Sequence, residues 1–296
     1  MTLDRRAWSR TGLVTSVLGW ALTDPDVLPR PVLHSTLERA RDAGIDLFDL
    51  TGVSGGSPIE QEIEQVLAEE VPGATVVSGR SMEGISRGPN RAAGLENALA
   101  ASLSDEVGSA QLTRLIEWRS DGDGDHDERA VEALKKLTTA QRIRGWGWRL
   151  TGRTSEAPEG ASFVSGPLSL IEPALLHRPG VELIPFLARD PFAGGRLDGT
   201  RFDQATSPLV RRTAPMPLRE IQRDLADVIA LAPLASGRGR TLAQAALRWV
   251  VDAREVTAVL APLPPPERLQ ELLAFPSVPP LSPAEQELVL RTRTRP

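Results

Sequence analysis

Two hydrophobic patterns alternate along the chain. Short, almost continuous apolar runs are typical of strands buried on both faces, and they are separated by stretches in which apolar residues recur every three or four positions, as in helices. The predicted strands are Thr15–Gly19, Ile45–Asp49, Thr75–Ser78, Leu112–Trp118, Ile143–Trp148, Ala161–Val164, Leu183–Ala188 and Val256–Leu260. The predicted helices lie near Leu33–Ala43, from Ile59 onward, near Asn90–Leu103, and over His126–Leu137, Leu218–Leu231 and Leu242–Val251.

Several helix ends are marked by capping residues. Ser57 precedes Glu60 by three positions, with Pro58 between them, which is a capping box with proline at the first helical position. Ser282-Pro283-Ala284-Glu285 repeats the signature near the end of the chain. Gly44 follows the first predicted helix and suits the left-handed conformation that often ends one.

Regular alternation of strand and helix predicts parallel strands joined by crossover helices. Eight such units in 296 residues fit a closed (β/α)8 TIM barrel better than an open sheet, and we expect residues 1–296 to form a single domain. No G-x-G-x-x-G motif follows the first strand, which disfavours a Rossmann fold. In a barrel of this kind the functional residues lie at the C-terminal ends of the strands.

Composition narrows the partners. The net charge of −5 and the pI near 5.4 argue against nucleic acid or an anionic membrane as the main partner and leave a small-molecule ligand as the expectation. Without cysteine, the chain has neither a thiolate nucleophile nor a cysteine-based zinc site. The three histidines (His34, His126 and His177) share no metal-ligand spacing, so no metal is expected.

The start of the chain has no apolar signal segment, and no window of about 18 apolar residues occurs. We therefore expect a cytoplasmic protein. The excess of Arg, Ala, Leu and Pro over Lys indicates a GC-rich bacterial source. The sequence leaves the oligomeric state open.

Six segments, in order along nearly the whole chain, resemble motifs of the aldo-keto reductases. They are Arg10–Gly19, Ala43–Asp49, Ser102–Trp118, Ala133–Trp148, Asp190–Gly199 and Ala243–Val250. The resemblance implies the same (β/α)8 barrel. It also implies, for a typical member, reduction of a carbonyl group with NADPH.

The four catalytic positions of that family are mostly altered here. Family members use a Tyr as general acid, a Lys that lowers its pKa, an Asp that pairs with the Lys, and a His that orients the carbonyl. The resemblance places these roles on Ser54, Arg80, Asp49 and Glu117, in that order. The chain contains no tyrosine. A serine hydroxyl is a far weaker acid than a phenol, and an arginine holds its proton too tightly to relay it.

The cofactor positions are altered as well. The Ser-Asn pair that holds the nicotinamide falls on Arg149 and Leu150, its assisting Gln at about Ser165, and the stacking Tyr at about Leu168. The loop that grips the 2′-phosphate reads Ala261–Pro265, without a donor side chain. Only the Gly194-Gly195 turn and Glu271 remain, as vestiges. No cofactor is therefore expected, and NADP only if the ancestral reaction is retained.

Asp49, Arg80 and Glu117 are expected at the barrel mouth, where two interpretations are open. They form either a rebuilt acid/base site, with Glu117 as acid or base and Arg80 as an anion clamp, or an inherited cluster kept because breaking it is costly. Other candidates are named together: Trp20, Trp118 and Trp148 would line a substrate pocket or pack in the core, and Arg149 would enter the former nicotinamide site or remain solvated.

Three functions remain open. The first is a cofactor-independent acid/base enzyme, such as a dehydratase, isomerase or cyclase. The second is a divergent NADPH-dependent reductase with Glu117 as proton donor, and the third is a non-catalytic binding protein. The sequence favours the first, because the replaced positions are polar and charged.

Overall fold

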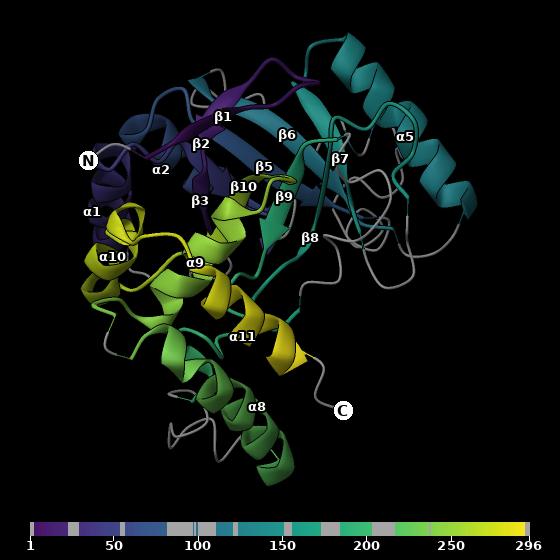
Figure 1. Ribbon diagram of the computed structural model, residues 1–296. Helices are drawn as coiled ribbons and strands as arrows, with labels where there is room; N and C mark the ends of the chain where they lie inside the picture. Colours follow the sequence, from purple (N-terminus) through teal and green to yellow (C-terminus); the bar gives the residue numbers. More distant parts are fainter. Residues whose placement is uncertain are drawn as a thin grey trace.

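Eight parallel strands close into a barrel in the computed structural model (Figure 1). The structure describes residues 3–22, 30–53, 57–81, 97, 99, 111–120, 124–150, 156–172, 184–202, 217–236 and 238–293. The barrel strands are β3 (Leu18–Ala21), β4 (Leu47–Asp49), β5 (Thr75–Arg80), β6 (Thr113–Trp118), β7 (Gly145–Arg149), β8 (Phe163–Pro167), β9 (Phe186–Arg189) and β10 (Val256–Pro262). They follow chain order around the barrel, and β10 pairs with β3 to close it. The predicted (β/α)8 barrel is confirmed.

A hairpin covers one end of the barrel. The first predicted strand, Thr15–Gly19, divides into β2 (Val14–Ser16) and the start of β3, and β2 pairs antiparallel with β1 (Arg5–Ala7). Figure 1 shows this hairpin lying across the barrel end. Trp8, which follows β1, is buried in the cluster of apolar side chains inside the barrel and meets the ring of Phe163 edge to face at 5.6 Å.

The described helices are α1 (Arg30–Asp42), α2 (Pro58–Glu70), α5 (Gly124–Thr139), α8 (Leu218–Leu231), α9 (Leu242–Asp252), α10 (Pro266–Leu273) and α11 (Pro283–Arg293), with short 3₁₀ turns at Ala232–Leu234 and Phe275–Ser277. The predicted helix near Asn90–Leu103 lies outside the described residues, except 97 and 99. The sequence did not predict α10, since the prolines before it read as loop. Pro266 stands at the first helical position, where a proline's missing N–H costs nothing.

The predicted capping residues act as caps. The Ser57 hydroxyl accepts the N–H of Glu60, and Ser282 and Glu285 bond each other's backbone N–H groups. Gly44 has φ +85°, and the bonds from Gly44 to Arg41 and from Ile45 to Ala40 complete a Schellman motif at the end of α1. These turns are fixed locally, which is why the sequence alone located them.

The two faces of the barrel wall bury different side chains. Toward the interior lie Leu47, Val77, Leu115, Phe163, Leu187, Ala258 and Leu260, in a cluster with Trp8. The alternate residues face the helices in a larger apolar layer. Gly147 leaves room in the interior for Phe163, since a Cβ there would lie 2.3 Å from its ring. No helix in the described parts of the chain has the length and apolar character needed to cross a bilayer.

Candidate functional site

Above the apolar interior layer, toward the C-terminal ends of the strands, the side chains are charged. Asp49 ends β4, Glu117 is the next-to-last residue of β6, and Arg149 and Arg189 end β7 and β9. Ser165 on β8 completes the group. The structure joins these five side chains, from five strands, into one network of hydrogen bonds and ion pairs, called here the mouth cluster.

Arg189 is the centre of the mouth cluster. Its two terminal nitrogens bond the two carboxylate oxygens of Asp49, one of them at 3.2 Å, and its Nε donates to Glu117 at 2.9 Å. Burial acts to lower the pKa of Arg189, but the charges and hydrogen bonds of Asp49 and Glu117 outweigh it, so that the pKa is raised. Arg189 therefore stays charged and bridges both carboxylates.

Arg149 extends the mouth cluster outward. Its Nε donates to the second oxygen of Glu117 at 2.7 Å, and a terminal nitrogen donates to the hydroxyl of Thr51 at 3.2 Å. The hydroxyl of Ser165 donates to the Glu117 oxygen that Arg189 also contacts. Burial lowers the pKa of Arg149, and the attraction of Glu117 offsets part of that effect.

Exposure changes in one direction through the mouth cluster. The side chain of Glu117 is 0% exposed, that of Asp49 2%, that of Arg189 9%, and that of Arg149 27%. Two carboxylates and two guanidinium groups balance in charge. The carboxylates are therefore sealed in the interior, and a guanidinium faces the solvent.

The predicted position of Arg80 is wrong. It pairs through both terminal nitrogens with Glu60 of α2, each at 3.1 Å. Residues level with each other on neighbouring parallel strands share a face, and Gly79, not Arg80, is level with Glu117. Arg80 thus faces the helices, and Arg189 takes the place that the sequence assigned to it.

Trp118 and Trp148 lie on the same outward face. Trp118 is level with Arg80 on one side and Trp148 on the other. Its indole nitrogen donates to Asp127 of α5 at 2.9 Å. Trp20 is fully buried in the same layer between strands and helices. The structure does not bring these three side chains together with the mouth cluster.

The loop after β9 begins with backbone that favours glycine. Gly194 and Gly195 have φ +66° and +83°, and Ala193 shares this left-handed conformation. The carboxylate of Asp190 accepts the N–H of Gly194 at 2.7 Å. A Cβ on Gly195 would lie 2.4 Å from the Thr200 hydroxyl oxygen, so the turn itself requires this glycine. Burial raises the pKa of Asp190, and the bond from Gly194 opposes that effect.

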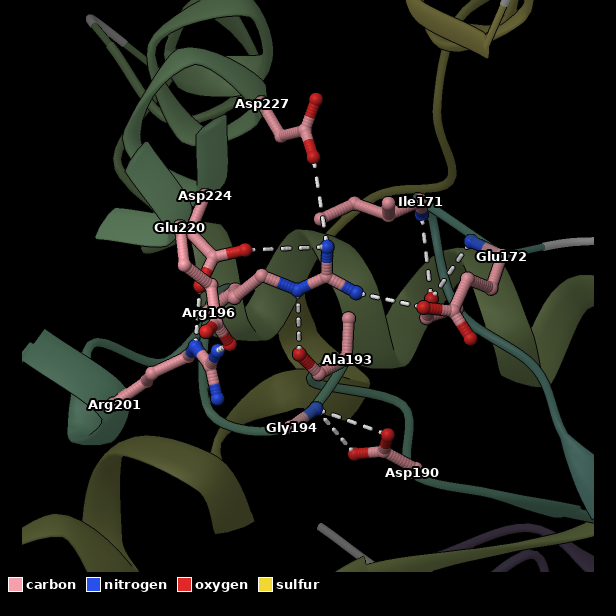
Figure 2. A network of polar contacts seen from close by, with 11 residues as sticks. Ile171, Glu172, Asp190, Ala193, Gly194, Arg196, Arg201, Glu220, Asp224 and Asp227 are labelled. Atoms are coloured by element: carbon pink, nitrogen blue, oxygen red, sulfur yellow. Dashed lines mark hydrogen bonds and ion pairs between the residues drawn. The ribbon is translucent and has the colours of Figure 1, made fainter. Parts of the chain in front are cut away.

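Two arginines tie this loop to α8. Figure 2 shows Arg196 pointing toward Glu172, Asp224 and Asp227, with nitrogen–oxygen distances of 2.7, 3.7 and 3.5 Å. Arg201 contacts Asp224 as well, through its Nε. These ion pairs hold the loop against α8 and Glu172.

The segment at the end of β10 has few hydrogen-bond donors. Four of its five residues from 262 to 266 are prolines, and the N–H of Leu263 donates to the carbonyl of Ala21 at 2.9 Å. Arg268 bonds the carbonyl of Asp198 at 2.5 Å and lies 3.3 Å from the carboxylate of Glu271.

Ser54, the residue at the position of the family's tyrosine, lies outside the described residues. Within the described ranges no group of three or more acidic or histidine side chains is arranged to hold a metal ion.

Solved structures share this fold. A glycerol dehydrogenase from Gluconobacter oxydans matches with a TM-score of 0.70 at 18% identity, over 98% of this chain and 94% of its own. The holo form of an aldo-keto reductase from Bacillus halodurans gives 0.67 at 16%, over 98% and 96%. An aldo-keto reductase from a deep-sea metagenome gives 0.64 at 12%, over 98% and 95%.

Sequence comparison adds no nearer relative. No protein-family model matches the chain, and no match was found among curated proteins. The structural likenesses therefore establish the fold, a (β/α)8 barrel of the aldo-keto reductase type. They do not carry a reaction over to this chain.

Proposed function

We propose that the protein acts on a small organic molecule at the C-terminal mouth of its barrel without a nicotinamide cofactor. The observation that carries the proposal is the mouth cluster itself: Arg189 bridges Asp49 and Glu117, which stand where the resemblance placed the catalytic aspartate and histidine. No tyrosine is present in the chain to serve as the proton donor of a carbonyl reduction.

The residues at the expected cofactor positions do not fit a nicotinamide dinucleotide. Arg149 and Ser165, which would hold the nicotinamide amide, both bind Glu117. The proline segment 262–266 offers no N–H to a phosphate apart from that of Leu263, which Ala21 accepts. Glu271 lies beside Arg268, so the one retained acidic position is paired within the chain.

The acid/base hypothesis survives with different roles for its residues. Glu117 and Asp49 hold the two guanidinium groups in place and keep them charged, so the part that faces a ligand is Arg149. A fixed guanidinium in a partly desolvated site stabilises negative charge that develops on a substrate oxygen, as in enolisation or elimination. A dehydratase or an isomerase fits this arrangement.

Titration of the purified protein with NADPH and NADP⁺, followed by heat and by nicotinamide fluorescence, tests the proposal. We expect no saturable binding at concentrations up to about 1 mM, which is well above the affinity of a working dinucleotide site. Micromolar binding of either form would overturn the proposal and restore the NADPH-dependent reductase as the leading function.

A further inference from the structure

We infer that the ligand of the mouth cluster carries a carboxylate group, which the guanidinium of Arg149 recognises. This inference rests on the proposed function, since it names the class of molecule that the cofactor-independent site would take. It depends on three features of the described residues: the order of burial, the fixed plane of Arg149 and the balance of charge.

The order of burial sets the sign of the ligand's charge. Glu117 and Asp49 are 0% and 2% exposed, whereas Arg149 is 27% exposed. A molecule that enters from solvent therefore meets the cation before it meets either carboxylate. A cationic ligand would lie against Arg149 and would be separated by it from Glu117, so an anion is favoured.

Two contacts fix the plane of the Arg149 guanidinium. Glu117 accepts from Nε at 2.7 Å and Thr51 accepts from a terminal nitrogen at 3.2 Å. Glu117 is in turn held by Arg189 and Ser165, so it cannot rotate away. A guanidinium held in this way recognises planar anions edge to edge and loses little side-chain entropy on binding.

The balance of charge favours a carboxylate over a phosphate. The mouth cluster contains two carboxylates and two guanidinium groups, and Arg189 is shared between Asp49 and Glu117. The mouth cluster is neutral as it stands, so a bound anion adds its whole charge next to Arg149, and a smaller added charge is easier to accommodate. A second negative charge would lie near Glu117 with Arg149 as the only exposed cation of the mouth cluster. The planar shape of a carboxylate also matches the guanidinium fork better than a tetrahedral phosphate does.

Calorimetric titration at constant ionic strength tests the inference. The probes are benzoate, lactate and succinate, with benzamide and lactamide as neutral counterparts and inorganic phosphate as the competing anion. We expect saturable binding of at least one carboxylate with a stoichiometry of one, and weaker or no binding of the amides and of phosphate. Equal binding of an amide and its acid, a preference for phosphate, or no binding of any carboxylate overturns the inference.

Variants assign that binding to Arg149. We expect Arg149→Gln to weaken carboxylate binding by about tenfold or more, since a charge-assisted bond is lost. Arg149→Lys keeps the charge but not the fork and should fall between. Arg39→Gln, at an exposed position on α1, removes the same charge elsewhere and should leave binding unchanged. Binding that survives Arg149→Gln overturns the inference.

Thr51 provides a check that does not alter the charged groups. Thr51→Val removes the hydroxyl that holds Arg149 but keeps the side-chain shape, whereas Thr51→Ser keeps the hydroxyl. Valine should weaken carboxylate binding by roughly two- to tenfold and serine should not. Equal affinities of the two variants would overturn this positioning role, and with it the fixed plane on which the inference depends.

The same protein separates the two proposals. Micromolar NADPH binding overturns the proposed function, whatever the carboxylates do. Failure of both NADPH and the carboxylates to bind leaves the cofactor-independent proposal standing and overturns only the choice of ligand.

Discussion

Two groups of buried ion pairs lie on opposite faces of the same barrel wall. On the outer face, Arg80 pairs with Glu60 and Arg114 pairs with Glu64, each strand residue with one residue of α2. On the inner face, the mouth cluster shares its charges among four strands, and Ser165 of a fifth strand donates to Glu117. All four outer side chains are 3–9% exposed, whereas the mouth cluster ends in Arg149 at 27%.

This difference in exposure indicates different roles for the two groups of ion pairs. The outer pairs join a helix to the sheet at a fixed distance and present no charge to solvent, which is what holding two elements together requires. The mouth cluster extends from buried carboxylates in the barrel interior to a partly exposed guanidinium group at the opening of the barrel. Breaking either set should cost stability, since an uncompensated buried charge is left behind. Only the mouth cluster should affect ligand binding.

The largest expected effect comes from Arg189→Met. It leaves Asp49 and Glu117 buried together without their shared cation, and we expect a loss of about 5 kcal/mol in the free energy of unfolding at pH 7. Urea denaturation measures it. A loss below about 1 kcal/mol would contradict the shared-cation role.

Arg80→Met should have the next largest effect. It leaves Glu60 buried opposite an apolar side chain and should cost about 3 kcal/mol in the free energy of unfolding. The double variant Glu60→Leu/Arg80→Met removes both charges and should recover most of that loss. Both proteins should bind carboxylates as the wild type does. Loss of binding in the folded double variant would place Arg80 in the functional site after all.

The sequence located the elements of the barrel but not all the directions in which side chains point. The eight predicted strands all overlap the observed ones. Buried parallel strands appear in the sequence as continuous apolar runs, and turn and capping residues mark where these runs end. Asp49 and Glu117 were correctly placed at the mouth. The partner cation was assigned to Arg80, by resemblance to a family lysine, although alternation along β5 turns Arg80 away from the interior.

Arg189 could have been found from the same alternation. Leu187 faces the interior, so the residue two positions later faces it as well. The predicted strand ends at Ala188, where its apolar run ends, and therefore leaves Arg189 out. The pairing of Arg149 with Glu117 could not be read from the sequence, since it depends on how far the two strands are staggered in the closed barrel.

Trp118→Phe gives the smallest expected effect and separates the two interpretations of the tryptophans. The change removes the indole bond to Asp127 and leaves an apolar ring in the layer between β6 and α5. We expect a loss of about 1 kcal/mol in the free energy of unfolding and no change in carboxylate affinity. Urea denaturation and calorimetric titration of the same sample measure both.

Trp118 is next to Glu117 in the chain but faces the opposite side of the barrel wall. A loss of stability without a loss of binding is therefore what core packing of Trp118 requires. A change of more than about threefold in carboxylate affinity, with the fold intact, would show that Trp118 on the outer face affects binding at the mouth cluster. That result would support the predicted pocket role of Trp118.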